Sequence, residues 1–572
     1  MKRTGTHAEV MRRARAIEAA LPEDAPRLAV LATFTAGTLA PYLTVDSHDA
    51  GFPLRPWIGP FGQLEQIVMA EDSGLWEADP AAVWIALRVE DVDPHLAVDV
   101  PDLDAGQVAA RLDAVGRRAV GVARAVRERS GACILVSNLF VPPKLAFDPF
   151  DASQPDGLGH LVAASNRELA RDLTDVPDAY VHDWAGFMAR FGWDAAHDAR
   201  MFYMARAPVG TDAQHDLARS VVRLGLGAIR PPSKCVVVDL DNTLWGGVLG
   251  DDGLRGIQLG DDYPGNVFKD VQAALLGLRR RGYLLAIASK NDDGLVREVL
   301  RAHPEMLLRE EHFAAIHADW EPKARSLRAI AEELNIGLDS LVFVDDNPLE
   351  RAQVAAELPM VTVVELPSQP TGYLDALRET FELDRPALLA EDRRRADMYR
   401  EERERRRLNE GAGSVEEFLR GLDMCAEVGL SDAGTLARIH QLINKTNQFN
   451  LTTLRHSLDE VSRLSDAPDA RVAWLRLSDR FGDSGLVCVG VLRREESATW
   501  RVDTLLMSCR VMGRHVEQAF FAYLGEQARE AGATRLAAHF IPTERNGMVR
   551  ELYETLGMTL ESETEDGRRE YR

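Results

Sequence analysis

One short stretch constrains this chain more than any other: four apolar residues, Cys235–Val238, followed at once by Asp-Leu-Asp-Asn-Thr. An apolar run without polar alternation is typical of a strand buried in a parallel sheet. Asp239 and Asp241 are two residues apart, so we expect both carboxylates to project the same way from the carboxyl edge of that sheet. One acid is suited to attack phosphorus and the other to exchange a proton with the leaving oxygen, and Mg²⁺ would offset their repulsion.

Three later motifs support a phosphoryl-transfer site. Residues 283–289 form a second apolar strand that ends at the hydroxyl of Ser289. Trp-Glu-Pro-Lys opens a helix with Lys323, and the strand 341–344 ends in Asp345 and Asp346. Two acid pairs, a hydroxyl and a lysine on successive α/β elements predict one site that binds and transfers a phosphoryl group.

These four motifs resemble the haloacid dehalogenase-like (HAD) phosphatase superfamily. The resemblance implies that Asp239 forms an aspartyl-phosphate and that Asp241 is the general acid and base. It also implies Mg²⁺ bound by Asp239, the carbonyl of Asp241 and Asp345, with Asp346 a ligand or an outer group. Lys323 would be catalytic, and the groups expected to hold the phosphate are Thr243, Ser289, Lys290 and Asn291.

Net charge, apolar content and cysteine spacing argue against several classes of protein. The 572 residues carry a formal net charge of −23, which argues against a nucleic-acid partner because such partners select a basic face. No run of 18 apolar residues predicts a membrane span, and no apolar segment follows the basic N-terminus as in a signal peptide. Five scattered cysteines indicate neither a disulfide framework nor a zinc site, so we expect a cytoplasmic protein.

Length and composition shifts predict several domains. Strand–helix alternation predicts parallel α/β sheets in the first two. The expected divisions are an α/β domain over 1–230, the phosphatase-like α/β domain over 231–385, a charged linker helix over 386–413, and an α+β domain over 414–572. After Thr243, Gly246 and Gly247 predict a short flap over the phosphatase site rather than a large cap domain.

The first domain resembles a degenerate SGNH-hydrolase-type domain. A polar turn with Thr33 and Thr35 follows its first strand, Asn138 follows a later strand, and Asp194 and His197 form a D-x-x-H pair. The serine that such hydrolases carry after the first strand is replaced by threonine. We therefore expect a binding or docking domain, with an esterase as the alternative.

The segment 391–410 is densely charged, with arginine runs at 393–395 and 405–407. Mixed charge predicts an exposed helix that serves as a linker. Because carrier proteins are typically acidic, these arginines are also the best basic patch in the chain for recruiting one.

The last domain resembles the GNAT acyltransferase fold in the order of its elements. A final helix is predicted over 546–556, ending at Gly557. Asn546, Tyr553 and Gly557 match the last helix of that fold, where the tyrosine can protonate a thiolate. The turn at 508–515, Ser-Cys-Arg-Val-Met-Gly-Arg-His, departs from the glycine-rich pyrophosphate loop and brings Cys509 to the place where a thioester would lie.

Taken together, the motifs Trp-Gly-Gly-Val at 245–248, Ser-Lys-Asn at 289–291, Asn-Lys-Thr-Asn-Gln-Phe-Asn at 444–450 and the 508–514 turn resemble the FkbH-like family. That resemblance implies a glyceryl transferase/phosphatase of polyketide biosynthesis. Its substrate would be 1,3-bisphosphoglycerate and its acceptor the phosphopantetheine arm of an acyl carrier protein. The glyceryl thioester would feed methoxymalonyl-type extender units or tetronate rings.

Within this scheme Cys509 is the candidate nucleophile that carries the glyceryl group. A turn thiol beside Arg510, Arg514 and His515 would be biased towards thiolate, whereas the ordinary fate of a cysteine is a buried structural position. With Tyr553, these residues form the predicted acyl-transfer set. The other four cysteines are expected in the core: Cys133, Cys235, Cys425 and Cys488.

Three functions remain open at this stage. The first is the bifunctional glyceryl transferase/phosphatase. The second is a plain magnesium-dependent phosphatase acting on a small phosphate ester, with flanking binding domains. The third is an N-acyltransferase whose phosphatase-like domain is only a scaffold. The intact acid pairs count against the third function, and the 508–514 turn counts against the second.

Overall fold

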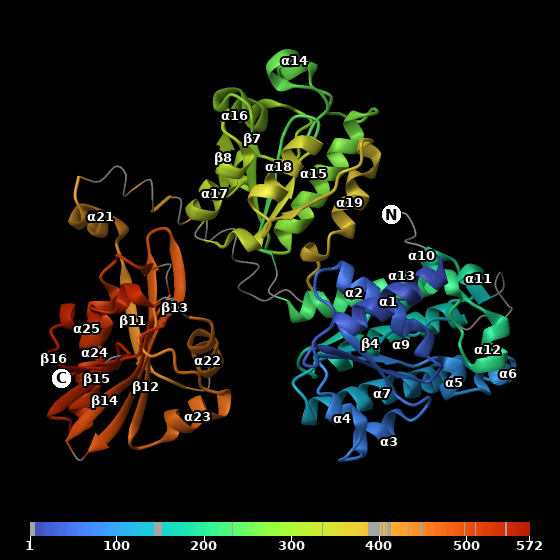
Figure 1. Ribbon diagram of the computed structural model, residues 1–572, viewed down its shortest axis with the longest axis horizontal. Helices are drawn as coiled ribbons and strands as arrows, with labels where there is room; N and C mark the ends of the chain where they lie inside the picture. Colours follow the sequence, from blue (N-terminus) through green and yellow to red (C-terminus); the bar gives the residue numbers. More distant parts are fainter. Residues whose placement is uncertain are drawn as a thin grey trace. The chain divides into compact units, whose positions relative to one another are not determined.

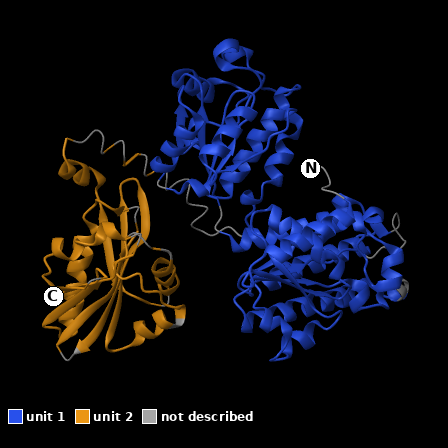
Figure 2. Cartoon of the chain, in the orientation of Figure 1, with its two compact units in different colours: residues 1–393 blue, residues 394–572 orange. Residues whose placement is uncertain are grey.

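The computed structural model describes residues 6–141, 151–230, 233–334, 336–386, 401, 404–405, 408, 413–432, 434–446, 449–496, 498–508, 511–543, 546–564 and 566–572. The chain divides into two compact units, Met1–Arg393 and Arg394–Arg572 (Figure 2). No helix among the described residues is long and apolar enough to cross a bilayer.

The first unit contains two parallel five-stranded sheets, and the first of them has the order β2-β1-β3-β4-β5. Its strands are β1 (Arg27–Ala32), β2 (Arg55–Ile58), β3 (Ala82–Ala86), β4 (Cys133–Ser137) and β5 (Ala179–His182). The helices of this part are α1 (His7–Ala20), α2 (Ala40–Asp49), α3 (Leu64–Met69), α4 (Gly74–Ala78), α5 (Val89–Val92), α6 (Leu96–Asp99), α7 (Ala105–Arg129), α9 (Leu158–Leu173), α10 (Trp184–Phe191), α11 (Trp193–Ala196), α12 (Ala199–Ala205) and α13 (Thr211–Ile229).

Alternating strand residues divide the core of this sheet into two layers. Ala29 and Leu31 pack with α3, α7 and α9 on one face. Leu28 and Val30 pack with α1, α2 and α13 on the other (Figure 1). Both faces are covered, as a parallel sheet requires, which explains its almost uninterrupted apolar strands.

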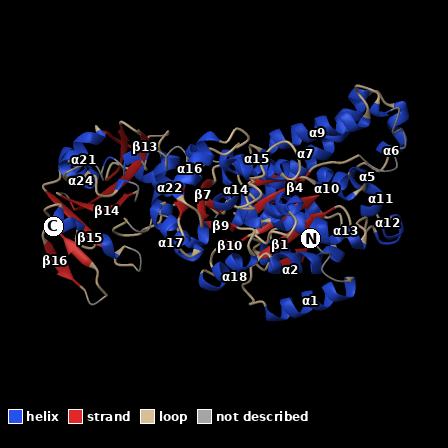
Figure 3. Cartoon of the chain, turned by 90° about the horizontal axis from the view of Figure 1, so that it is seen from above, coloured by secondary structure: helices blue, strands red, loops and turns tan. Residues whose placement is uncertain are grey.

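The second sheet has the order β10-β9-β6-β7-β8, again with every pair parallel. Its strands are β6 (Cys235–Val238), β7 (Leu284–Ser289), β8 (Ala315–Ala318), β9 (Leu341–Val344) and β10 (Thr362–Val363). Its helices are α14 (Leu249–Gly256), α15 (Gly265–Arg280), α16 (Asp293–Ala302), α17 (Lys323–Glu333), α18 (Pro348–Glu357) and α19 (Tyr373–Glu379). Figure 3 shows the strands of this unit lying among helices.

The central position of β6 determines where the candidate catalytic residues of this sheet lie. β6 pairs with β7 on one side and with β9 on the other. The residues that follow these three strands therefore meet at one carboxyl edge. Asp239 and Asp345 follow β6 and β9, while Ser289 ends β7.

The second unit is built on a seven-stranded mixed sheet of order β11-β12-β13-β14-β15-β17-β16. β14 and β15 pair in parallel and the other neighbours pair antiparallel. The strands are β11 (Cys425–Leu430), β12 (Ala470–Asp479), β13 (Gly482–Glu496), β14 (Thr499–Met507), β15 (Arg535–Phe540), β16 (Leu560–Glu563) and β17 (Arg569–Tyr571). The helices are α21 (Val415–Leu422), α22 (Leu436–Lys445), α23 (Leu458–Asp466), α24 (Val516–Glu530) and α25 (Leu552–Thr555).

β14 and β15 pair only along Thr499–Val502 and Arg535–Ala538, and beyond that point a distant segment lies between them. Leu451 N–H donates to Leu505 O of β14 at 3.1 Å, and Leu451 O accepts from Ile541 N–H at 2.8 Å. Met507 N–H donates to Phe449 O at 3.0 Å. Asn546, fully buried, donates from Nδ2 to Asn450 O at 2.9 Å and so fixes the inserted segment.

The predicted fold class is confirmed in its architecture: two parallel α/β sheets are followed by a mixed α+β sheet. The predicted final helix over 546–556 is wrong in extent. A 3-10 turn at Gly547–Val549 precedes the short α25, because Asn546 is used to fix the inserted segment rather than to continue a helix.

Candidate active site

Three acids meet at the carboxyl edge of the second sheet. Val238 and Val344 are partners in the β6–β9 register, and Asp239 N–H donates to Val344 O at 2.9 Å. This pairing brings Asp239 beside Asp345, the next residue after β9. One carboxylate oxygen from each of Asp239, Asp345 and Asp346 lies within 4.8 Å of the others. Asp239 is 8% exposed and Asp345 1%, so the cluster is largely shielded from water.

Lys323 supplies a buried cation to this cluster. It is the first residue of α17, and its Nζ donates to Asp239 Oδ1 and, at 2.6 Å, to Ala288 O. Asp345 Oδ2 lies 3.2 Å from the same Nζ. Burial alone would lower the pKa of Lys323, but the carboxylates of Asp239 and Asp345 outweigh it and hold the pKa above its ordinary value. The lysine is therefore charged and bridges the ends of β6 and β9.

The acids repel one another despite Lys323. Burial, and then the charge of Asp239, raise the pKa of Asp345 to about 6, although Lys323 acts in the opposite sense. Burial and Asp239 also raise the pKa of Asp346, with Thr243 opposing them through its hydroxyl. A bound cation would relieve this repulsion.

Arg351 supports the loop that carries Asp345 and Asp346, and sequence analysis missed it. Its Nη1 donates to the main-chain oxygens of both acids at 2.8 Å, and its Nη2 donates to Leu366 O at 3.2 Å. Arg351 lies on α18 and is 7% exposed. Asn347 N–H also donates to Asp345 Oδ1 at 2.8 Å. No local pattern distinguishes Arg351 from the surface arginines of other helices.

Asp241 has different partners from Asp239. Its Oδ1 accepts from Trp245 Nε1 and from Leu249 N–H, both at 3.0 Å. Its Oδ2 accepts from Asn291 Nδ2 at 2.9 Å. β6 ends at Val238, before either acid, so strand alternation does not decide the directions of their side chains. Among the described residues, the acid group suited to a metal contains Asp239, Asp345 and Asp346, without the Asp241 carboxylate.

The predicted phosphate-binding groups lie on the loops that surround this cluster. Ser289 is 3% exposed, and its Oγ accepts from Asn291 Nδ2 at 3.0 Å. Thr243, fully buried, accepts from Asp346 N–H at 3.2 Å. Lys290 forms an ion pair with Glu350 at 2.6 Å. Thr243, Ser289 and Asn291 therefore face the acids, while Lys290 is paired with α18.

The predicted acyl-transfer residues lie in the second unit, and two of them, Cys509 and Arg510, are outside the described residues. Arg514 is 5% exposed and donates from Nη1 to Asp479 Oδ2 at 3.2 Å. His515 Nδ1 lies 3.4 Å from Gln518 Oε1. Tyr553 is fully buried between Phe521 and Tyr571, and burial raises its pKa above the ordinary value.

Three of the four cysteines expected in the core are buried: Cys133, Cys235 and Cys488. Burial raises the pKa of the Cys133 thiol to about 12, and it also raises the pKa values of Cys235 and Cys488. The expectation for Cys425 is wrong, because its strand β11 is the edge of the sheet and the thiol is exposed.

The expectation of a solvated linker helix is wrong at Arg405. This side chain is 4% exposed and donates to both carboxylate oxygens of Asp479. The position is buried because Asp479, 74 residues further along, supplies a fully buried counter-charge. The other arginines of the predicted carrier-binding patch lie outside the described residues.

The SGNH-like candidates in the first sheet mostly serve its own structure. Asn138 donates to Asp183 Oδ1 at 2.9 Å and accepts from Ala185 N–H at 2.8 Å. Thr35 Oγ1 donates to Ala205 O at 2.7 Å. Thr33 Oγ1 accepts from Arg88 N–H at 3.0 Å, and His197, of the D-x-x-H pair with Asp194, stacks on Trp193.

Comparison with known proteins includes an extensive structural likeness. The chain matches no protein-family model and no curated protein. It is similar to the crystal structure of the N-terminal part of BF1531 from Bacteroides fragilis, described as containing a phosphatase domain complexed with Mg. The two share 26% sequence identity with a TM-score of 0.57, over 67% of this chain and 100% of that one.

Acetyltransferase structures match a smaller part. The GNAT domain of PAT from S. lividans shares 18% identity over 26% of this chain and 88% of its own, with a TM-score of 0.21. A putative GNAT-family acetyltransferase from Desulfovibrio desulfuricans shares 13% identity over 26% and 97%, with a TM-score of 0.22.

Proposed function

We propose that this protein is a magnesium-dependent phosphatase joined to an acyltransferase, a glyceryl transferase/phosphatase of the FkbH-like kind. The observation that carries the phosphatase is the buried cluster of Asp239, Asp345, Asp346 and Lys323 at one sheet edge. The likeness to a phosphatase structure that contains Mg supports it. The acyl-transfer half rests on the sequence resemblance and on the GNAT-like sheet.

The acid cluster fits Mg²⁺. Its donors are carboxylate oxygens, which Mg²⁺ prefers, and they converge within 4.8 Å. Three acids face one buried lysine, so a divalent cation would balance the remaining charge. Asp239, Asp345 and Asp346 would hold the ion through their carboxylates, and Asp241 through its carbonyl. Bound there, the ion would stabilise the charge that develops on the transferring phosphoryl group.

Phosphate removal then takes two steps on this chain's own residues. Asp239 attacks the phosphorus, the phosphorus–oxygen bond to the substrate breaks, and Asp241 gives a proton to the departing oxygen. Asp241 next takes a proton from water as that water attacks the aspartyl-phosphate, which releases inorganic phosphate and restores Asp239. Lys323 neutralises charge at Asp239, and Thr243 and Ser289 bind the phosphate oxygens, whereas Asn291 donates to Asp241 and Ser289 and Lys290 is paired with Glu350.

Acyl transfer begins from the mixed anhydride of 1,3-bisphosphoglycerate. The Cys509 thiolate attacks the acyl carbon and the C1 phosphate leaves, so a thioester forms without another energy source. The phosphopantetheine thiol of an acyl carrier protein then takes the acyl group and restores Cys509. Arg510, Arg514 and His515 would favour the thiolate, and Tyr553 would serve as its proton donor. The product would be a glyceryl thioester for a polyketide extender unit or a tetronate ring.

Incubation of the full chain with 1,3-bisphosphoglycerate and Mg²⁺ tests both halves. Without a carrier protein, we expect a glyceryl or phosphoglyceryl mass on the peptide that contains Cys509, released by hydroxylamine. Cys509→Ala should lose the adduct and carrier loading, whereas Asp239→Asn should still load the carrier but retain the 3-phosphate. Full carrier loading by Cys509→Ala would refute the enzyme thioester, and phosphate release by Asp239→Asn at the wild-type rate would refute the nucleophile.

One observation favours the simpler alternative of a plain magnesium-dependent phosphatase. In the second unit Arg514 is engaged by Asp479 and Tyr553 is fully buried, so these two side chains have structural partners in place of a substrate. Phosphate release from a small ester without any adduct or carrier loading would select this alternative.

A further inference from the structure

The flap that follows β6 holds the carboxylate of Asp241 in one direction. Two donors from the flap, Trp245 Nε1 and Leu249 N–H, converge on Oδ1 at 3.0 Å each. A third donor, Asn291 Nδ2 on the loop after β7, lies 2.9 Å from Oδ2. Both oxygens are thus oriented by hydrogen bonds, and rotation of the carboxylate would break at least one of them.

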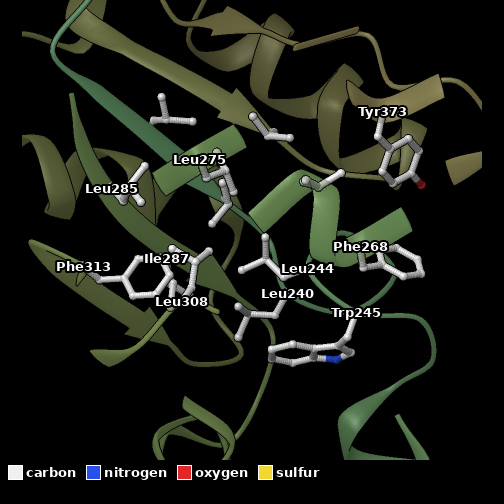
Figure 4. Close-up of a cluster of buried hydrophobic side chains, with 14 of the residues drawn as sticks. Leu240, Leu244, Trp245, Phe268, Leu275, Leu285, Ile287, Leu308, Phe313 and Tyr373 are labelled. Carbon is white, nitrogen blue, oxygen red and sulfur yellow. The ribbon is translucent and has the colours of Figure 1, made fainter. Parts of the chain in front are cut away.

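The flap donors are themselves fixed. The indole of Trp245 is fully buried and belongs to the cluster of Leu240, Leu244 and Phe268 (Figure 4). Leu249 is the first residue of α14, and its side chain is 2% exposed in the same cluster. Close packing around the buried indole holds its N–H in position.

Two glycines allow the turn that brings both flap donors to one oxygen. A Cβ at Gly246 would lie 2.8 Å from Gln258 Oε1 and 3.0 Å from Phe268 Cε2. Gly247 has φ of 93°, which side-chain-bearing residues rarely adopt, and its N–H donates to Asn242 Oδ1 at 2.9 Å. The Trp-Gly-Gly-Val motif is therefore a structural requirement for directing the indole and the Leu249 amide to Asp241.

Asn291 joins the same carboxylate to the phosphate side of the site. Its Nδ2 donates to Asp241 Oδ2 and, at 3.0 Å, to Ser289 Oγ. The side chain is 5% exposed. Asn291 therefore links the orientation of the Asp241 carboxylate to the position of the Ser289 hydroxyl, where the phosphate is expected to bind.

We propose that Trp245 and Asn291 are positioning residues that aim Asp241 at the oxygen leaving phosphorus. This inference rests on the proposed phosphatase. In the step concerned, the Asp239–phosphorus bond forms, the bond from phosphorus to the substrate oxygen breaks, and the proton of Asp241 passes to that oxygen. An alkoxide is a poor leaving group and depends on this proton, whereas p-nitrophenolate leaves without it.

Leaving-group dependence tests the proposal. We expect Trp245→Phe and Asn291→Ala to lower kcat/KM for glycerol phosphate about tenfold or more, since positioned proton transfer contributes about 10²–10⁴-fold. For p-nitrophenyl phosphate the loss should be about twofold at most, because kcat/KM covers only the steps through departure of the first product. Equal losses on both esters would overturn the proposal and leave the two residues with a structural role only.

Controls separate this outcome from failure of the proposed function. If the wild type with Mg²⁺ hydrolyses neither ester, the phosphatase itself is refuted. Trp84→Phe is the matched control, since this buried indole also donates a hydrogen bond, 2.8 Å to Ser137 Oγ, in the first sheet. It should leave the ratio of the two rates unchanged. Asn291→Ala keeps the test decisive if Trp245→Phe fails to fold.

A spectroscopic measurement checks the hydrogen bond directly. In the full chain labelled with ¹⁵N-tryptophan, the indole resonance that disappears in Trp245→Phe belongs to Trp245. Asp241→Ala should shift this resonance upfield and speed its exchange with solvent deuterium, while the Trp84 resonance stays in place. An unchanged Trp245 resonance would refute the contact on which the proposal depends.

Discussion

Arg405 donates two hydrogen bonds to the carboxylate of Asp479, from Nε to Oδ2 at 2.6 Å and from Nη2 to Oδ1 at 2.8 Å. Both side chains are almost completely buried, at 4% and 0% exposure. Arg514, from the turn that carries Cys509, bonds to the same carboxylate at 3.2 Å. A segment expected to be a linker is thus tied to the predicted acyl-transfer turn through one shared acid.

Removing Arg405 should therefore destabilise the second unit. Arg405→Leu would leave Asp479 with one of its two arginines, and loss of a partner from a buried ion pair costs about 3–5 kcal/mol. Differential scanning calorimetry of the full chain should show the transition of this unit at a lower temperature. Arg476→Leu is the control, because Arg476 is 51% exposed and pairs with Asp483 at the surface. Its cost should stay below about 1 kcal/mol, and equal effects would contradict the assignment.

Substitution of Arg351 should weaken magnesium binding without touching a ligand. Arg351→Lys keeps the positive charge but cannot hold the two carbonyls of Asp345 and Asp346 in the planar geometry of a guanidinium. Loss of such outer support typically costs about 10–100-fold in metal affinity. Isothermal titration with Mg²⁺ measures it. Arg378→Lys, at an arginine 69% exposed on α19, should bind Mg²⁺ as the wild type does.

Chelation should separate the two halves of the proposed activity. Excess EDTA should abolish phosphate release, because the cluster of Asp239, Asp345 and Asp346 would lose the ion that offsets its charge. Attack of a thiol on the acyl phosphate involves no group of that cluster, so formation of the Cys509 adduct should continue. Mg²⁺ should restore phosphate release. Loss of both activities on chelation would contradict separate sites.

Stability of the first sheet should fall in mild acid because of His182. This imidazole is fully enclosed between the hydroxyls of Ser137, at 3.0 Å, and Ser220, at 2.9 Å, and burial lowers its pKa from 6.5 to about 4. The unfolded chain takes up a proton near pH 6.5 and the folded chain only near pH 4. Stability is therefore complete above pH 6.5 and is lost progressively down to pH 4, by about 3 kcal/mol.

The pH dependence of unfolding measures this loss. His182→Gln should flatten the decline between pH 6.5 and 4, even if the variant is less stable at pH 7. His317→Gln is the control, because His317 lies on β8 with Glu333 at 3.0 Å and is not enclosed. A slope unchanged in His182→Gln would refute the assignment of the acid sensitivity to His182.

Local patterns were sufficient to place the predicted phosphatase residues within the second sheet. Asp239, Ser289, Lys323 and Asp345 each stand at the end of a buried strand or the start of a helix, so their places follow from adjacent residues. A parallel sheet then brings strand ends together without further information. The direction of the Asp241 carboxylate could not be predicted from these patterns. β6 ends before Asp241, and hydrogen bonds from the flap fix the orientation of its carboxylate.

The second unit shows what local patterns miss. Burial of Arg405 depends on Asp479, and a run of charge predicts exposure unless a distant counter-charge is known. The pairing of Leu451 with Leu505 joins residues more than fifty positions apart, and no periodicity signals it. Arg351 likewise donates to main-chain carbonyls. Every residue has such a carbonyl, so residue type does not predict this contact.

The segment between β14 and β15 has a consequence for the exchange of amide hydrogens. Leu451 accepts from Ile541 and donates to Leu505, while Phe449 accepts from Met507, so one short stretch protects the amide at the end of β14 and the amide just after β15. Release of that stretch would expose the N–H groups of Leu451, Met507 and Ile541 together. These three amides should therefore exchange at one common rate, faster than Val502, whose strand pairs directly with β15. The segment between β14 and β15 should therefore detach as a unit, and the hydrogen bond from Asn546 to Asn450 O is the contact that holds it in place.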